Sequence, residues 1–389
     1  MRRGDLTALP LVILLMVGCG GDQEVNAAAV AGARLSGFLG ESDAQGYARA
    51  EQPRRFVFPR DHAAHQAFRT EWWYLTAVLQ NEHQAEFGVQ FTLFRQRLGP
   101  PGQEDEIDGP WRSDQAYMGH LAVTDVADAR HEHGQRLVRA HPSLAGVVWA
   151  GEESGQSVRA YIEDWSLTIS DEQEGGFSLT GAIDRRALVE LRFKPQCAVV
   201  LQGEQGLSRK GPSGASYYYS MPRLQTSGWL EVAGRRHQVM GLAWLDREWS
   251  TSVLGEHLAG WNWFALQLAD GRSIMVFKLS RKDGGADPYD HGVIVSDCAT
   301  RQVQRMLSAD DYELTPTRFW TDPHGTAWPV AWSLLLDGDR MNIEAMVDDQ
   351  LMDDGLRYWE GVVAVRDANQ QELGRGYMEL TGYSSEVAE

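Results

Sequence analysis

The sequence predicts an all-β protein that consists of two antiparallel β-barrels in tandem. Short runs in which apolar and polar residues alternate dominate the chain from Phe56 onward, and such runs are typical of β-strands. Helical periodicity is scarce, and turns rich in Gly, Asp and Asn separate the runs at the spacing of a sandwich or barrel. Three motifs also occur twice in the same order, which indicates a duplicated domain.

The repeated motifs lie at 71–79 and 260–268, at 164–167 and 331–334, and at 241–246 and 374–379. Within the first of them, Trp72 aligns with Trp261, and Tyr74 aligns with Trp263. Each repeated unit is far longer than a solenoid or propeller repeat, so the two copies are expected to be whole domains.

Each copy opens with a strong hairpin signal. In the first copy, 71–79 and 87–95 flank a polar turn and are rich in aromatic and β-branched residues. In the second, 261–268 and 273–279 flank the turn Asp270-Gly271. The other expected strands are 116–125, 157–169, 177–183, 188–194, 228–232, 239–244, 328–336, 342–347 and 361–366. About eight to ten up-and-down strands per unit predict lipocalin-like barrels, and a jelly roll is the main alternative.

The N-terminal segment is expected to be a lipoprotein signal peptide, residues 1–18. Arg2 and Arg3 precede a short apolar stretch that is too short to span a bilayer as a helix. Gly18 and Cys19 resemble a bacterial lipobox, in which the Cys carries the lipid; an ordinary signal peptide with an incidental Cys is the alternative. The chain is therefore expected to be anchored by lipid in the outer membrane and to face the periplasm.

Three further segments complete the expected domain organisation. They are a flexible tether at 19–52, an N-terminal lipocalin-like barrel at 53–254 and a C-terminal lipocalin-like barrel at 255–389.

Charge and cysteine content exclude several classes of function. The formal net charge of -18 disfavours nucleic acid, whose phosphates need a basic surface. With Cys19 assigned to the lipid, Cys197 and Cys298 remain, and as two thiols in separate domains they are expected to be unpaired, although an oxidising periplasm permits a disulfide.

The sequence predicts neither a metal nor a cofactor. His62 and His65 are close in sequence, as are His131 and His133, but neither pair has an evident third ligand. No phosphate-binding loop, dinucleotide fingerprint or nucleophile elbow is present.

The segment 244–250 is the strongest candidate for chemistry. On an extended chain Trp244, Asp246 and Glu248 share one face. A carboxyl group among aromatic rings has its charged form desolvated, so its pKa rises and it becomes a usable general acid. The alternative is an Arg-carboxylate pair that closes one end of a barrel.

Glu71 is a similar candidate, because it stands beside Trp72 and Tyr74. Arg95 and Gln90 lie across the predicted hairpin, and an ion pair between Arg95 and Glu71 is the structural alternative to catalysis. The residues expected to contact a ligand are Trp72, Tyr74, Gln90, Arg95, Tyr218, Trp244 and Trp263.

Four motifs together resemble the AttH-like family, which is related to carotenoid 1,2-hydratase (hydroxyneurosporene synthase). They are Glu-Trp-Trp-Tyr at 71–74, Gly-Val-Gln-Phe-Thr-Leu-Phe-Arg at 88–95, Tyr-Tyr-Ser-Met-Pro-Arg at 218–223 and Ala-Trp-Leu-Asp-Arg-Glu-Trp-Ser at 243–250. The resemblance covers roughly residues 55–385 and implies two lipocalin-like barrels in tandem.

The resemblance also implies a chemistry. The hydratases are thought to protonate a terminal isoprenoid double bond with an aspartic acid and to let water trap the carbocation, which would make this chain a hydro-lyase. Asp246 is the position carried over for the acid, with Trp244 and Trp263 as walls that stabilise the cation. Other relatives guide cycloadditions. This chain departs from the hydratases in its lipoprotein signal, since carotenoid assembly is associated with the cytoplasmic membrane.

Three functions remain open from the sequence. The first is an enzyme that acts on an apolar, isoprenoid-like or polyketide-like ligand. The second is a non-catalytic lipoprotein that binds a hydrophobic ligand, with an exporter as a partner. The third is an assembly platform whose barrels contain no cavity. A poised acid that faces a cavity would distinguish the first from the other two.

Overall fold

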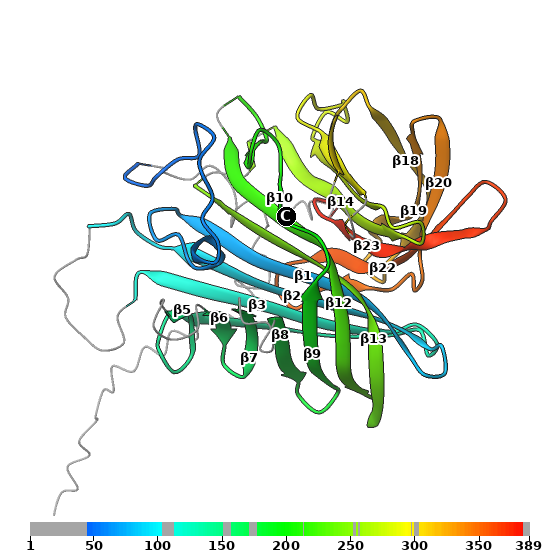
Figure 1. The fold of residues 1–389 in the computed structure, drawn as a ribbon, viewed down its shortest axis with the longest axis horizontal. Coiled ribbons are helices and arrows are strands. Elements are labelled where there is room, and N and C mark those ends of the chain that lie inside the picture. Colours follow the sequence, from blue (N-terminus) through cyan, green and yellow to red (C-terminus); the bar gives the residue numbers. More distant parts are fainter. Residues whose placement is uncertain are drawn as a thin grey trace, which may run out of the picture.

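The computed structural model describes residues 45–102, 113–150, 157–170, 177–212, 214–251, 254–255, 257–296, 298 and 303–383. It confirms the all-β prediction: two large, curled antiparallel sheets make up the molecule (Figure 1). The helical structure among these residues is one short 3₁₀ helix, η1 (Arg60–His62). Within these residues, no helix is long and apolar enough to cross a membrane. The predicted signal peptide and Cys19 lie outside the described residues.

The first sheet is a continuous antiparallel array with two short strands attached to it. Its order is β4 (Arg130–Arg139), β3 (Gln115–Asp125), β2 (Glu86–Arg97), β1 (Thr70–Asn81), β13 (Arg235–Ser250), β12 (Ala215–Val232), β9 (Ala187–Pro195), β8 (Phe177–Ile183), β7 (Trp165–Ser170), β6 (Ser157–Ile162) and β5 (Ala145–Ala150). The short strands β10 (Val200–Leu201) and β11 (Leu207–Arg209) pair with β12.

The second sheet is built in the same way and lies beside the first (Figure 1). Its order is β17 (Val303–Ser308), β16 (His291–Ser296), β15 (Ser273–Arg281), β14 (Leu258–Leu268), β23 (Glu372–Leu380), β22 (Tyr358–Arg366), β20 (Asp339–Ala345), β19 (Ala327–Leu336) and β18 (Tyr312–Thr321), with β21 (Leu351–Met352) on β22.

Two of the three sequence repeats occupy equivalent places in the two sheets. β1 lies between β2 and β13, as β14 lies between β15 and β23. Tyr74 pairs with Asp246 in the first sheet, and Trp263 pairs with Glu379 in the second. The repeat at 164–167 and 331–334 does not occupy equivalent places in the two sheets. Trp332 lies on β19, whose equivalent by sheet order is β8, whereas Trp165 lies on β7.

Several strands were missed by sequence reasoning, among them β4, β5, β16, β17 and β18, and others differ from the predicted ones in length. The run expected at 228–232 is the end of β12 and the run expected at 239–244 is the middle of β13, two long strands of 18 and 16 residues. The run at 157–169 is divided into β6 and β7 by a turn in which Glu163 has a φ of 54°. The aromatic segment at 217–223 belongs to β12, so a strand presents Tyr218.

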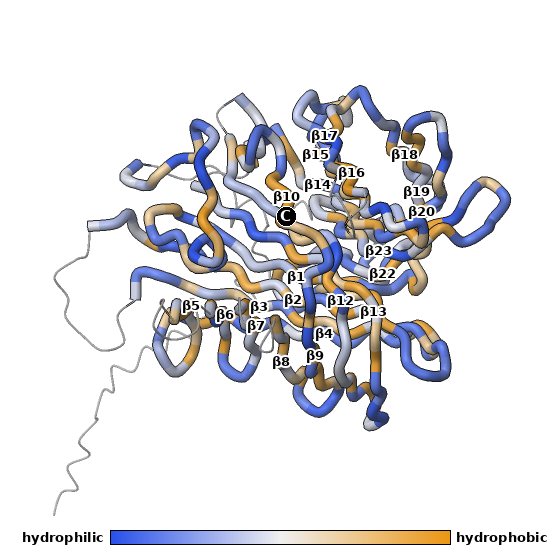
Figure 2. Tube along the Cα trace, in the orientation of Figure 1, coloured by the Kyte–Doolittle hydropathy of each residue, from blue (hydrophilic) through white to orange (hydrophobic). Residues whose placement is uncertain are grey.

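Alternation along β1 explains why both faces of the sheet are apolar. Trp73 and Leu75 point into the core of the first barrel, whereas Tyr74 joins a separate cluster between the barrels. That cluster combines residues such as Trp244 of the first sheet with Trp263 of the second. A third cluster fills the second barrel. Figure 2 shows the apolar positions along the strands and the hydrophilic ones at the loops.

The expectation that Cys197 and Cys298 are unpaired is wrong. The two residues form a disulfide that joins the loop after β9 to the segment after β16. Their assignment to separate domains led to the wrong prediction, since two domains that pack against each other bring distant thiols together.

Replacing Cys197 with Ser is expected to lower the free energy of unfolding by about 2–4 kcal/mol, because the disulfide closes a long loop in the unfolded chain. The sequence separation of the two cysteines is 101 residues. Urea denaturation of the oxidised wild type and of the variant measures the difference. A non-reduced tryptic digest in which no peptide joins Cys197 to Cys298 would contradict the assignment.

Candidate functional site

A cavity of about 50 Å³ lies between the two barrels. The first barrel contributes Trp72, Tyr74, Thr92, Phe94, Lys210, Tyr218, Asp246 and Glu248, and the second contributes Trp261, Trp263, Phe277, His291, Tyr358 and Glu379. The cavity exists because strands β1 and β13 face β14 and β23, so that the outward faces of two sheets form one lining of aromatic and charged side chains.

Asp246 is buried at this cavity and accepts three hydrogen bonds. Ser220 Oγ and Trp244 Nε1 donate to Oδ1 over 2.5 and 2.7 Å, and Tyr218 OH donates to Oδ2 over 2.7 Å. Burial raises the pKa of Asp246 to about 7, although these three donors favour the charged form and limit the rise. At neutral pH the carboxyl group can therefore hold a proton and release it.

Glu248 also lines the cavity, but a cation holds it. Lys210 Nζ and Ser216 Oγ both donate to Oε1 of Glu248. The ammonium group of Lys210 also lies 5.4 Å from the ring centres of Trp72 and Phe277, where the ring faces attract it. Glu248 thus forms a buried ion pair, which leaves Asp246 as the better candidate for a proton donor.

The aromatic side chains meet edge to face. Tyr74 and Trp263 have ring centres 5.1 Å apart at 86°, and Trp244 and Trp263 have ring centres 6.2 Å apart at 80°. Trp263 Nε1 donates to Tyr218 OH over 3.3 Å, which ties the second barrel to the donor network of Asp246. Trp244 contacts Trp263 and Asp246 but does not itself line the cavity, so it packs behind the residues that do.

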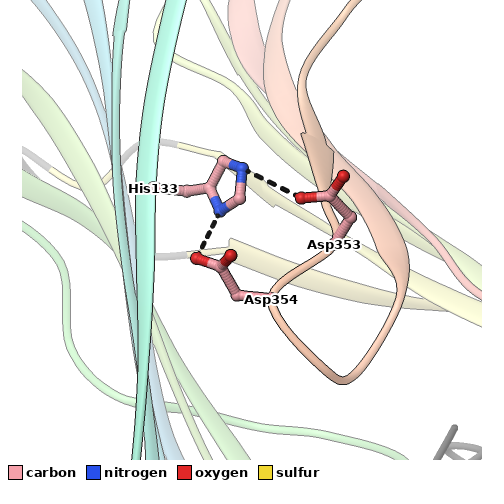
Figure 3. Close-up of side chains that lie close together, drawn as sticks. All are labelled: His133, Asp353 and Asp354. Carbon is pink, nitrogen blue, oxygen red and sulfur yellow. Dashed lines mark ion pairs between the residues drawn. The ribbon is translucent and has the colours of Figure 1, made fainter. Parts of the chain in front are cut away.

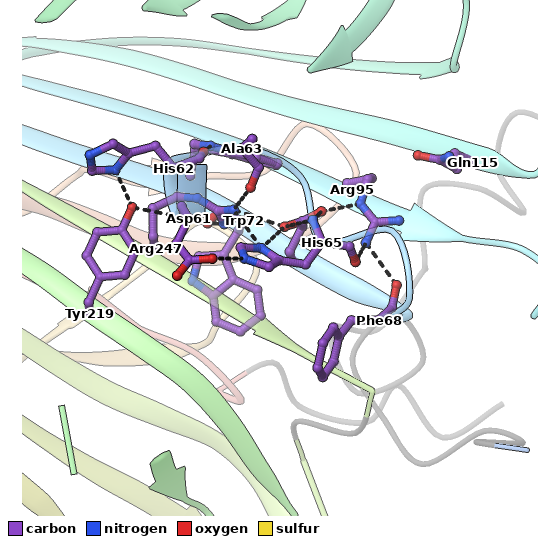
Figure 4. A network of polar contacts seen from close by, with 12 residues as sticks. Asp61, His62, Ala63, His65, Phe68, Trp72, Arg95, Gln115, Tyr219 and Arg247 are labelled. Atoms are coloured by element: carbon purple, nitrogen blue, oxygen red, sulfur yellow. Dashed lines mark hydrogen bonds and ion pairs between the residues drawn. The ribbon is translucent and has the colours of Figure 1, made fainter. Parts of the chain in front are cut away.

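Glu71 and Arg95 lie on the opposite face of the first sheet, inside the barrel. Arg95 Nε and Arg247 Nη2 both bind the carboxylate of Glu71, the latter over 2.9 Å, and His65 donates its backbone N–H over 3.0 Å. These partners hold the pKa of Glu71 well below its usual range, although burial opposes them. Figure 4 shows Arg95, His65 and Arg247 in this network. Glu71 and Arg95 are thus separated from the cavity by the sheet.

Gln90 lies on the cavity side of β2 but does not line the cavity. Its Nε2 donates to the hydroxyl of Thr92, the next residue on the same face, over 2.5 Å. The structure therefore brings together Trp72, Tyr74, Tyr218, Asp246, Glu248 and Trp263 at one cavity.

Two carboxyl groups of the second barrel were missed by sequence reasoning. Burial raises the pKa of Glu379 to about 8, with Asp246 and Glu248 adding to the rise and Trp261 and Lys210 opposing it. The repeat contained the signal, because the alignment of 241–246 with 374–379 places Glu379 at the position of Asp246.

Glu360 is the cross-strand neighbour of Glu379 on β22. Its side chain is fully buried, and neither carboxyl oxygen has a hydrogen-bond partner among the described residues. Burial and the Glu379 carboxyl raise the pKa of Glu360 well above its usual range, and the nearby hydroxyls of Tyr74 and Tyr358 partly oppose this rise.

One group of metal-ligand type occurs among the described residues, outside the cavity. His133 on β4 lies between Asp353 and Asp354 of the second barrel, with contacts of 3.3 and 3.1 Å (Figure 3). Both carboxylates are about half exposed, and the contacts describe an ion pair between the barrels once the imidazole is protonated. His62, by contrast, bonds to Tyr219 OH over 2.5 Å inside the first barrel.

Comparisons with known proteins place this fold and site in context. A family model described as AttH-like matches residues 49–383. The crystal structure of an AttH protein from Nitrosomonas europaea is 32% identical with a TM-score of 0.73, and the match covers 87% of this chain and 100% of that one. None of the curated proteins matches the sequence significantly.

Two more distant structures share the fold. Kievitone hydratase from Nectria haematococca is 14% identical with a TM-score of 0.55, and the match covers 90% of this chain and 99% of that one. CghA, solved with Sch210972, is 12% identical with a TM-score of 0.54, and the match covers 89% and 98% of the two chains.

Proposed function

Because this chain belongs to the AttH-like family, we propose that it is an enzyme that hydrates or isomerises a carbon–carbon double bond of an apolar ligand. Asp246 is the proton donor in this proposal. The observation that carries it is a buried carboxyl group with a pKa of about 7 that faces an aromatic cavity. A hydratase among the structures of the same fold is consistent with the reaction class.

The reaction would proceed through a carbocation. Protonated Asp246 gives its proton to one carbon of the double bond, and the positive charge that develops on the other carbon lies among the rings of Trp72, Tyr74 and Trp263. A water molecule then bonds to the cationic carbon, or a neighbouring carbon loses a proton. The first outcome is hydration and the second is isomerisation.

The size of the cavity limits which part of a ligand it receives. A volume of about 50 Å³ holds a few water molecules, or the reacting end of a longer molecule. A carrier that protects a whole lipid needs a much larger enclosure. The small volume therefore favours an enzyme that handles the end of an isoprenoid-like or polyketide-like chain over a non-catalytic carrier.

Two measurements test the reaction class. Native mass spectrometry of protein purified gently from its own membranes, followed by extraction, identifies a retained apolar ligand. Incubation of the protein with that ligand in H₂¹⁸O, followed by mass spectrometry, detects hydration as incorporated ¹⁸O. A ligand that stays unchanged in both mass and double-bond position would count against the proposal.

We also propose that Cys19 carries a lipid that anchors the protein in the outer membrane, facing the periplasm. Replacing Cys19 with Ser is expected to move the protein from the membrane fraction to the soluble fraction, since the surface of so acidic a chain offers little attraction to anionic lipids. Immunoblots of fractionated cells measure this, with Cys197→Ser as a cysteine control that stays anchored. Unchanged membrane association of Cys19→Ser would contradict the lipid anchor.

A further inference from the structure

We propose that Glu379, supported by Glu360, is the second acid–base group of the cavity and faces Asp246 from the other barrel. In this role Glu379 accepts the proton that the attacking water releases. The inference rests on the proposed function for the identity of the reaction, but the pairing of the two carboxyl groups can be tested without any substrate.

The duplicated fold places the two carboxyl groups in equivalent positions. Asp246 stands on β13 opposite Tyr74 of β1, and Glu379 stands on β23 opposite Trp263 of β14. The rings of Tyr74 and Trp263 meet at 5.1 Å, so the two equivalent strand pairs face each other across the cavity. Both Asp246 and Glu379 line that cavity. A group bound there lies between two carboxyl groups from different barrels.

The charges around Glu379 leave it without a dedicated cation. Lys210 is the nearby cation that acts on it, but the Lys210 ammonium group is hydrogen-bonded to Glu248. On the adjacent strand, Glu360 is fully buried with both oxygens unpartnered among the described residues. A buried carboxyl group without a cation keeps its proton near neutral pH. Glu360 therefore stays protonated beside Glu379, whereas Glu379, which is only partly buried and lines the cavity, can gain and lose a proton there.

The titratable groups that surround Glu379 come from both barrels. They are Tyr74 on β1, Tyr218 on β12, Asp246 and Glu248 on β13, Lys210 after β11, His291 on β16, and Tyr358 and Glu360 on β22. Burial and the two carboxyl groups of β13 raise the pKa of Glu379, whereas Trp261 and Lys210 lower it. The pKa of Glu379 therefore depends on the charge of Asp246 in the opposite barrel.

The working state holds one proton on the pair, at Asp246; it is the less populated of the two singly protonated forms, because the pKa of Glu379 lies above that of Asp246. Protonated Asp246 transfers its proton to an alkene carbon, the π electron pair forms the new C–H bond, and the adjacent carbon becomes cationic. A water oxygen supplies the electron pair of the new C–O bond. The resulting oxonium loses one proton to ionised Glu379. The proton of the pair has then moved from Asp246 to Glu379. Proton exchange with solvent returns the pair to the form that is protonated at Asp246.

This arrangement also defines the class of ligand. Carboxyl groups on both sides would repel a carboxylate or phosphate at the reacting end, and they would stabilise a developing cation there. The reacting end is therefore expected to be uncharged, as in a prenyl alcohol, and a fatty acid headgroup is disfavoured.

The first test is a titration of the carboxyl groups by infrared spectroscopy, which detects the C=O band of the protonated form. The infrared difference spectrum between the wild type and Glu379→Gln should contain one C=O band that disappears near pH 8, where Glu379 loses its proton. In the Asp246→Asn background the same group should titrate at lower pH, because a neighbouring negative charge is gone. Glu313→Gln, an exposed Glu→Gln control on β18, should remove no such band.

The second test uses farnesol as a neutral prenyl probe in H₂¹⁸O. A pair that works with one proton predicts a bell-shaped pH profile of kcat, with the two macroscopic limbs near pH 7 and 8. Glu379→Gln should lower kcat about 100-fold and remove the low-pH limb, since a missing base no longer needs to ionise. Glu313→Gln should retain the wild-type profile.

The two tests separate the failure of the function from the failure of the pairing. If farnesol is not hydrated but the Glu379 band moves in Asp246→Asn, the pairing stands and the proposed reaction loses support. The pairing is overturned if Glu379→Gln removes no C=O band at neutral pH. It is equally overturned if the pH at which the Glu379 band is lost is the same in Asp246→Asn as in the wild type. Should Glu379→Gln fail to fold, Glu360→Gln replaces it, and an unshifted titration of Glu379 in that variant overturns the proposal equally.

Discussion

Replacing Asp246 with Asn is expected to lower turnover by about 10²- to 10⁴-fold, the usual contribution of a general acid. Asn has nearly the same shape, and its amide oxygen can accept the bonds from Ser220 Oγ and Trp244 Nε1 that reach Oδ1 of Asp246. Its amide nitrogen can donate to Tyr218 OH. The variant therefore keeps the packing of the cavity but has no proton to give. The measurement is kcat for the ligand extracted from the native protein.

Two comparisons give this result its meaning. Ligand affinity, measured by calorimetry, should change by less than about tenfold, because Asn retains the apolar walls. Asp337→Asn on an exposed turn, where Asp337 pairs with Arg305, should leave turnover unchanged. If Asp246→Asn turns over as fast as the wild type, Asp246 is not the acid, and Glu379 becomes the group to test in its place.

The same substitution is also expected to change how the free energy of unfolding depends on pH, and to stabilise the protein at high pH. The pKa of Asp246 is raised in the folded state to about 7, from 3.8 as an ordinary Asp. The unfolded chain therefore releases this proton first, and the free energy of unfolding falls as the pH rises from about 4 to about 7. The Asn variant lacks this decline, so it should be at least as stable as the wild type at pH 8 in urea titrations.

Replacing Glu71 with Gln is expected to have the largest effect on stability, a loss of about 3–5 kcal/mol in the free energy of unfolding. The carboxylate lies between Arg95 and Arg247, and all three side chains are fully buried. Removal of its charge leaves two buried cations without an anion. Arg247 also stacks 3.8 Å from the ring centre of Trp73 and bonds to the backbone of Trp72, so the damage reaches β1.

A surface pair on the same barrel provides the matched control. Glu190 pairs with Arg236 at 3.0 Å with both side chains about half exposed, and Glu190→Gln should change stability by less than about 1 kcal/mol. Because the pKa of folded Glu71 is depressed, its contribution is complete above about pH 5 and is lost as the pH falls toward the folded value. The difference between wild type and Glu71→Gln should therefore shrink in acid. A loss below 1 kcal/mol at pH 7 would contradict this account.

The position of Glu71 shows how a one-residue step along a strand separates stability from function. Glu71 and Trp72 are adjacent, yet one lies inside the barrel and the other lines the cavity, because successive side chains point to opposite faces. The sequence predicts this alternation. It does not show which face is the interior and which one a second barrel covers.

The sequence by itself determined the features that depend on local physics or on repetition. Period-two alternation and turn residues predicted the strands and the all-β class, and the repeats predicted two similar units. The apolar setting of Asp246 predicted a raised pKa, and the structure gives that direction. These features follow from residues close in the chain, so a single sequence contains them.

Only the tertiary structure decided what depends on distant residues. It paired Cys197 with Cys298, gave Glu248 a buried partner in Lys210, and placed Glu379 across the cavity from Asp246. Each of these contacts joins strands or loops far apart in the chain. The disulfide and the position of Glu379 depend on the packing of one barrel on the other, and the pair of Lys210 with Glu248 depends on the folding of the first barrel. No local pattern records which of these distant residues meet.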